Sequence, residues 1–241
     1  MQPPAVPRIS ARQVVAAAEK AAGPNMTLGV AVLDLRTGEL AVGRDGAREF
    51  MSASLSKLVL AVDVLDRYRQ LDPADRELIN RALSGSDDNA MNVLWGKYDG
   101  AGTIGRVADR LGLNGTLPPD SVGKWGDTLI TAADMVTIYR HILRDMAPPD
   151  RAVIVDALAA TSAVAADGFG QHYGLLHQGA SREHYAKQAW VPYRPAGFLL
   201  HSAGVTDGRY AIALLSIQLY TDARTARDRL STVAAAAVDS R

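Results

Sequence analysis

The order of apolar and polar positions divides the chain into two sheet-forming ends and a helical middle. Residues 9–22 carry apolar and alanine positions at helical spacing behind Ser10, which predicts a capped N-terminal helix. Two apolar runs separated by a turn at Gly38 then predict a β-hairpin. Near the C-terminus the pattern of apolar positions again predicts strands, and these are followed by a helix. The hairpin strands cover residues 27–35 and 39–43, the later strands residues 185–191, 198–205 and 209–219, and the last helix residues 221–238.

The middle of the chain has the period of helices. Residues 54–68 are apolar on nearly every side, which indicates a helix in the centre of the core. A loop rich in proline and glycine covers residues 115–127, and residues 161–183 show no regular period. Five further helices are predicted at residues 74–83, 88–97, 102–111, 131–144 and 150–160.

This order of elements predicts an α+β fold. We expect a five-stranded antiparallel sheet, because short turns such as the one at Gly208 join the later strands without room for a crossover. The N- and C-terminal helices would flank the sheet, and an all-helical subdomain would be inserted into it. We expect the sheet subdomain to comprise residues 1–50 and 178–241 and the helical subdomain residues 51–177, together forming one domain.

Composition excludes several classes of function. Lys plus Arg and Asp plus Glu number 26 each, so no basic surface is available for nucleic acid, and we expect no nucleic-acid partner. The chain has no cysteine, which excludes disulfides, thiolate metal sites and a cysteine nucleophile. No apolar run approaches the roughly 20 residues that a transmembrane helix needs, so no transmembrane segment is expected. Residues 1–7 look like a linker, which leaves open whether an export signal preceded them.

The first candidate for chemistry lies in the stretch FMSASLSKLVL, residues 50–60. Here Ser54 and Lys57 are one helical turn apart, where the central helix is expected to begin. On local grounds Ser54 would cap the helix and Lys57 would be an ordinary residue of its first turn. A lysine on the same helix face as a serine can also take the proton from the hydroxyl and so activate it as a nucleophile.

Two further short segments give this pair a context. The segment SDD at residues 86–88 would by itself be a helix N-cap at Ser86 followed by acidic residues. The segment KQA at residues 187–189 would by itself place a solvent-facing lysine on a strand. Together and in this order, the three segments resemble the S-x-x-K, S-D-N and K-T-G elements of class A β-lactamases and penicillin-binding proteins. The resemblance extends over nearly the whole chain, because the order of the predicted elements is also similar.

A second segment could also correspond to the third of these elements, K-T-G. The sequence HSAG at residues 201–204 also resembles a K-T-G element in which His201 replaces the lysine. The family has two strands and a helix after this element, and only a start at Lys187 leaves both strands and the helix. The resemblance therefore favours Lys187 over His201.

The resemblance implies a role for each of these residues. Ser54 would be the nucleophile that forms an acyl-enzyme, Lys57 the base, and Ser86 the relay that passes a proton to the leaving nitrogen. The backbone N–H groups of Ser54 and Trp190 would hold the oxyanion. The residues expected to bind the substrate are Asp88, Lys187, Gln188, Ala189 and Trp190.

The sequence departs from the family pattern in three places. Asp88 stands where the family has asparagine, and a nearby carboxylate would raise the pKa of Lys57 and keep it protonated. No glutamate occurs between Glu77 and Glu183, so the loop acid that activates the deacylating water is missing, although Asp120 or Asp127 could replace it. In the KQA segment, glutamine replaces a hydroxyl residue and alanine replaces glycine, which would narrow the cleft.

We therefore predict a serine hydrolase that acts on a β-lactam or on a peptidoglycan-type peptide ending in D-alanine and releases its acyl-enzyme poorly. The alternative is a non-catalytic relative that binds cell-wall peptides or a protein partner. The substrates of the family lie outside the cytoplasm, so we expect an extracytoplasmic location in the cell envelope. The histidines at 172, 177, 184 and 201 lack the i, i+4 spacing of metalloprotease ligands, so we expect no metal and no other cofactor.

Overall fold

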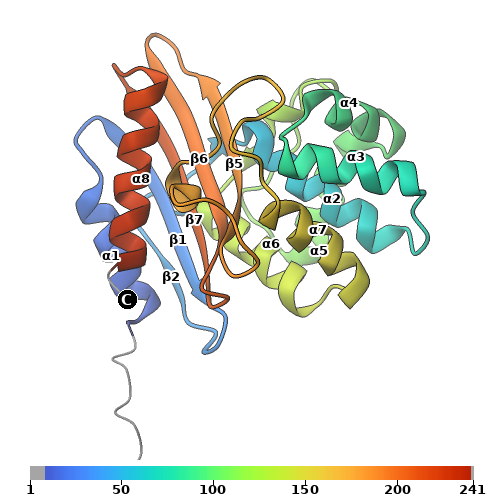
Figure 1. The fold of residues 1–241 in the computed structure, drawn as a ribbon, viewed down its shortest axis with the longest axis horizontal. Helices are drawn as coiled ribbons and strands as arrows, with labels where there is room; N and C mark the ends of the chain where they lie inside the picture. The colour runs from blue at the N-terminus through green and yellow to red at the C-terminus, as the bar shows by residue number, and fades with distance from the viewer. Residues whose placement is uncertain (1–8, 240–241) are drawn as a thin grey trace, which may run out of the picture.

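The centre of the molecule is a five-stranded antiparallel sheet with the strand order β2-β1-β7-β6-β5 (Figure 1). The computed structural model describes residues 9–239, so the linker-like start of the chain lies outside this range. A separate pair of short strands, β3 and β4, lies outside the main sheet. The α+β fold predicted from the sequence is confirmed. The strands are β1 (Met26–Asp34), β2 (Leu40–Val42), β3 (Phe50–Met51), β4 (Leu129–Ile130), β5 (Tyr185–Pro192), β6 (Gly197–Thr206) and β7 (Tyr210–Leu219).

The two ends of the chain meet in the middle of this sheet. β1 pairs with β7 along its whole length, from Met26 opposite Gln218 to Asp34 opposite Tyr210. β6 and β7 form a hairpin whose turn places Asp207 and Gly208 at φ angles of 52° and 57°. Both values are left-handed, as the tightest hairpin turns require. β5 is left at one edge of the sheet, next to the inserted helices (Figure 1).

Helices cover both faces of the sheet (Figure 1). α1 and α8 lie on one face and pack against side chains such as Val32 and Leu214. The inserted helices lie on the other and pack against alternate residues such as Leu33 and Ala213, as the period of two along a strand dictates. No helix within residues 9–239 is both long and apolar enough to cross a membrane. The helices are α1 (Ala11–Ala21), α2 (Ser56–Arg67), α3 (Pro73–Ser84), α4 (Asp88–Lys97), α5 (Gly100–Leu111), α6 (Ala132–Arg144), α7 (Pro148–Ala159) and α8 (Ala223–Asp239).

The starts of α2 and α4 differ from the expected capping. Ser54 lies in a 3₁₀ turn, η1 (Ala53–Leu55), that precedes α2, and the N-cap of α2 is Leu55, which makes no side-chain cap bond. At α4 the N-cap is Asp87, whose carboxylate accepts from the first-turn backbone N–H groups. The predicted capping by Ser54 and Ser86 is therefore wrong. Neither hydroxyl caps a helix, so both can form hydrogen bonds with other groups.

Candidate active site

Three segments that are distant in the sequence meet at the edge of the sheet. η1 lies alongside β5, and Ser86, two residues before α4, reaches the same place. Two of the residues that shape these turns, Ala53 and Ser86, have left-handed φ angles of 43° and 52°. Such angles are strained for residues other than glycine, and the strain tends to concentrate at functional sites. The turn before α2 is braced by a 2.7 Å hydrogen bond from the Ser52 N–H to the Thr128 carbonyl.

A chain of buried hydrogen bonds links the predicted catalytic residues. The Lys57 Nζ lies 2.9 Å from the Ser54 Oγ, 2.7 Å from the Ser86 carbonyl oxygen and 2.6 Å from Asp88 Oδ1. The Lys187 Nζ donates to the Ser86 Oγ at 2.8 Å, so this hydroxyl lies between the two lysines. The structure thus brings Ser54, Lys57, Ser86, Asp88 and Lys187 together. The strand alone suggested that Lys187 faces solvent. That prediction is wrong, since this residue is fully buried.

Both lysines are buried. Burial lowers the pKa of Lys57 below its ordinary value of 10.5, and the neighbouring carboxylates, Asp88 first, act in the opposite direction. Burial lowers the pKa of Lys187 well below 10.5, and the positive charge of Lys57 lowers it further. Burial therefore shifts both lysines toward the neutral form, which is the form that can accept a proton from a serine hydroxyl.

An open pocket with about 530 Å³ of empty space lies over Ser54. Trp125 lies in its wall, with its ring centroid 4.9 Å from the Lys57 Nζ and its Nε1 donating to Asn92. The lining residues are Met51, Ala53, Ser54, Asp88, Trp125, Gly126, Asp127, Asp167, Trp190 and Val191.

Comparison with known proteins identifies a relative along most of the chain. No protein-family model matches it. The curated protein "Putative lipoprotein LppW" from Mycobacterium tuberculosis and from Mycobacterium bovis is 33% identical to it over 220 residues. This match covers 88% of the chain and 69% of LppW. The chain belongs to the LppW family.

Solved structures share the fold of this LppW-family chain. A variant of the TLA-1 extended-spectrum β-lactamase superimposes with a TM-score of 0.74 at 11% identity and covers 95% of this chain and 98% of that one. A class A β-lactamase from Bacteroides cellulosilyticus gives a TM-score of 0.73 at 14% identity, with coverage of 97% and 99%. The fold of this LppW-family protein is therefore that of class A β-lactamases, as the sequence motifs indicated.

The LppW-family chain differs from the expected arrangement along β5. Successive side chains of a strand point to opposite faces, so Gln188 points away from Lys187. Its amide is fully buried and donates to the backbone carbonyls of Gln171 and Tyr173. Ala189 is also fully buried, in the core that faces the helices. The structure therefore places both outside the pocket, and of the residues predicted to bind substrate only Asp88 and Trp190 line it.

The rival residue His201 lies in the interior on β6. Its Nδ1 accepts from the Ser216 N–H at 3.1 Å, so the proton is on Nε2, which donates to the Met51 carbonyl at 2.9 Å. Burial lowers the pKa of His201 to about 4. This neutral histidine anchors the strand that leads to Ser54. It makes no contact with Ser86, and Lys187 occupies that place.

Asp167 and Trp125 are among the pocket residues that sequence reasoning missed. Asp167 lies in the irregular segment before β5, where no motif or period pointed to it. Trp125 lies in the loop rich in proline and glycine, and its neighbour Asp127, proposed above as a replacement acid, lines the pocket as well. Asp120, the other proposed acid, is not among the lining residues. A tryptophan within such a loop was the one available signal.

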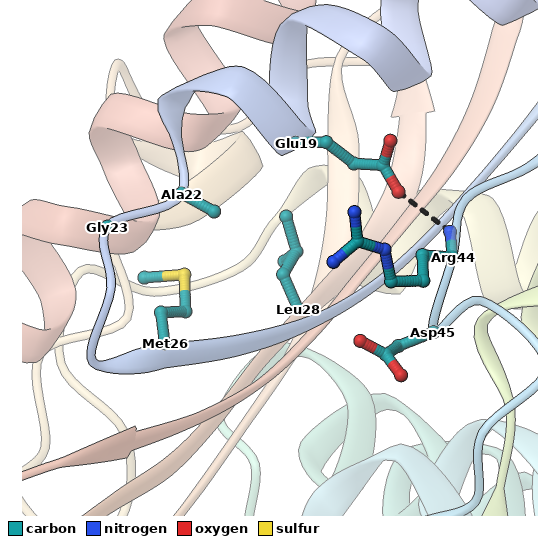
Figure 2. Close-up of a pocket in the computed structure, with 7 residues that line it drawn as sticks. All are labelled: Glu19, Ala22, Gly23, Met26, Leu28, Arg44 and Asp45. Carbon is teal, nitrogen blue, oxygen red and sulfur yellow. Dashed lines mark hydrogen bonds between the residues drawn. The ribbon is translucent and has the colours of Figure 1, made fainter.

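A second hollow of similar size, about 540 Å³, lies on the other side of the sheet (Figure 2). It is formed by α1, the start of β1 and the loop after β2, and the Glu19 carboxylate closes one side by accepting from the Arg44 N–H at 2.7 Å. No serine, lysine or histidine lines it. Among residues 9–239, no three histidine or acidic side chains are grouped closely enough to hold a metal ion. The pocket over Ser54 is therefore the candidate active site.

Proposed function

We propose that this protein is a serine hydrolase in which Ser54 is acylated by a β-lactam or by the amide of a peptide ending in D-alanine. The observation that carries the proposal is the buried series of contacts from Ser54 through Lys57 and Ser86 to Lys187, at the floor of an open pocket. A nucleophile, a base of depressed pKa and a proton relay are the groups that amide cleavage needs.

The contacts support a definite sequence of steps. Neutral Lys57 takes the proton from Ser54 across 2.9 Å while the Ser54 Oγ bonds to the carbonyl carbon. The carbonyl oxygen becomes an oxyanion, for which we propose the backbone N–H groups of Ser54 and Trp190 as donors. When the carbon–nitrogen bond breaks, the leaving nitrogen takes a proton from the Ser86 hydroxyl, which Lys57 resupplies. Lys187, at 2.8 Å, holds that hydroxyl in place.

Release of the acyl group is proposed to be slow. Deacylation needs a carboxylate that can take a proton from water, and the lining contains no glutamate. Asp88 is bonded to Lys57, and Asp167 accepts from Trp190 and from the Phe169 N–H. Asp127 makes no side-chain hydrogen bond or ion pair within the described residues, so it remains the candidate for a weak general base.

A second candidate function is binding without catalysis. It is favoured by the 2.6 Å contact between Asp88 and Lys57, because a bonded carboxylate stabilises the protonated lysine that cannot act as a base. In this case the pocket would bind cell-wall peptides or a protein partner. The lipoprotein name of the relative supports an extracytoplasmic location in the cell envelope for either function.

Intact-mass measurement after exposure to benzylpenicillin tests the proposal. We expect a single adduct with the mass of the whole antibiotic, located on Ser54, that persists for minutes or longer. Ser54→Ala should form no adduct, whereas Ser121→Ala, which removes an exposed loop hydroxyl, should form it normally. Saturable binding without a mass change would support the non-catalytic alternative. Multiple turnovers of nitrocefin that disappear in Ser54→Ala would contradict slow release.

A further inference from the structure

The ionisable side chains that line the pocket are all acidic. Asp88, Asp127 and Asp167 contribute carboxylates, and no lysine, arginine or histidine is among the lining residues of the described chain. All three aspartates are exposed to solvent, so a ligand in the pocket can approach them. Any ligand that enters therefore meets an excess of negative charge.

The two lysines beneath the pocket do not cancel this charge. Lys57 forms an ion pair with Asp88 and with no other carboxylate of the pocket. Lys187 is fully buried, and its Nζ donates to Ser86 and to the Gln188 carbonyl and not to a carboxylate. Within residues 9–239, neither Asp127 nor Asp167 forms an ion pair. Two carboxylates of the pocket, Asp127 and Asp167, consequently remain outside any ion pair among the described residues.

Two tryptophans complete the wall. The indole of Trp125 already lies against one amino group, since the Lys57 Nζ is 4.9 Å from its ring centroid. The Nε1 of Trp190 donates to Asp167 at 3.0 Å, and its ring is stacked on Phe169 with centroids 4.6 Å apart, which fixes that carboxylate at the pocket wall. Carboxylates beside indole rings attract ammonium groups through charge and through the ring quadrupole.

We propose that the pocket selects acyl donors that carry an ammonium group and discriminates against donors whose only charge is a carboxylate. In its kinetic form this inference rests on the acylation of Ser54 proposed above, but the preference concerns binding and does not require acylation. The selecting residues are Asp127 and Asp167, since Asp88 is already paired with Lys57.

Three penicillins separate the effect of charge from that of shape. Ampicillin differs from benzylpenicillin by one amino group on the acyl side chain, and N-acetylampicillin retains the added bulk without the charge. We expect ampicillin to acylate the wild-type protein about tenfold faster than either of the others, the size expected from one exposed ion pair together with one cation–π contact. The difference should shrink at high salt, because the carboxylates are exposed.

Variants assign the preference to particular residues. Asp127→Asn and Asp167→Asn should each reduce the ampicillin preference about threefold, and acylation by benzylpenicillin should become faster because repulsion is removed. Asp109→Asn removes the same charge from an exposed position of α5 outside the pocket and should retain the full preference. Equal rates for the three penicillins in the wild type, or equal ratios in all four proteins, would overturn the inference.

A binding measurement separates this inference from the proposed function. In Ser54→Ala no acyl-enzyme can form, so calorimetric titration with the same three compounds reports binding alone. Tighter binding of ampicillin supports the inference even where no penicillin acylates the wild type, a result that would contradict only the hydrolase. Tighter binding of benzylpenicillin, or no binding of ampicillin, overturns the inference even where acylation occurs.

Discussion

Two clusters of buried charge lie on the same helix, α2, and they are organised in opposite ways. The first surrounds Asp63, whose side chain is fully buried and is bonded to Arg67, Arg106 and Arg110 at 3.2, 2.9 and 3.4 Å. Each arginine is about one-third exposed, with side-chain exposures of 37%, 32% and 34%. The second cluster contains Lys57, and it reverses this arrangement.

At Lys57 the buried charges are alike and the balancing charge is exposed. Lys57 and Lys187 are both buried, and Asp88, the one carboxylate bonded to them, is 61% exposed. A buried acid with several arginine partners joins the helices that supply those partners. Two buried cations with one solvated partner instead have depressed pKa values, as candidate catalytic groups do. The comparison teaches that pairing, more than burial, separates a structural charge from a reactive one.

Removal of the lysine should affect chemistry and leave folding nearly intact. We expect Lys57→Met to slow acylation by benzylpenicillin by about 1000-fold or more, because Ser54 loses its base. The free energy of unfolding should stay the same or rise, since a buried charge is replaced by an apolar chain and Asp88 is solvated. Mass spectrometry and urea denaturation measure the two effects. An unchanged acylation rate, or a loss of several kcal/mol in stability, would remove the distinction between the clusters.

Removal of the buried acid should have the reverse outcome. We expect Asp63→Asn to lower the free energy of unfolding by about 2–4 kcal/mol, because three arginines and the Thr103 hydroxyl lose their common partner. Acylation of the folded fraction should remain normal, since Asp63 does not line the pocket. Asp109→Asn, on an exposed part of α5, should change stability by less than about 0.5 kcal/mol. A destabilisation no larger than in this control would contradict the structural role of the Asp63 cluster.

The sequence predicted the elements of the fold because their periods are long and regular. α4 begins and ends at the residues expected from the sequence, Asp88 and Lys97, and the strands of both ends form one sheet. Backbone conformation was harder to predict. Ser54 precedes an apolar helix as a cap would, and only the left-handed φ of Ala53 moves it into a separate turn. An alanine is not expected in that region of φ and ψ, so no sequence signal marked it.

The candidate site was predicted as a set of motifs, and motifs do not give the directions of side chains. Neighbouring residues of KQA must point to opposite faces of β5. The sequence could not show that Lys187 lies on the face with Ser86, or that Gln188 is buried on the opposite face and bonds to the Gln171 carbonyl. Both faces of β5 are buried there, so apolar and polar positions do not alternate. Asp167 lies in an irregular loop without a period, and only the folded chain brings it to the pocket.

The smallest expected effect concerns Asp88, the carboxylate whose contact with Lys57 favours the non-catalytic alternative. At Asp63 a carboxylate maintains the cluster, whereas at Lys57 the hydrogen bond that the lysine donates to Asp88 raises a lysine pKa that burial lowers. Asp88→Asn should therefore lower the pKa of Lys57 further, increase its neutral fraction at neutral pH, and shift the rise of the acylation rate to lower pH. Because Asp88 is exposed, we expect a gain of only about fivefold at neutral pH, the strength of an exposed ion pair. The pH dependence of acylation measures this, and the gain should vanish when Lys57→Met is combined with Asp88→Asn. A variant no faster than the wild type at any pH would show that Asp88 does not restrain the lysine, which would remove the main support for the non-catalytic alternative.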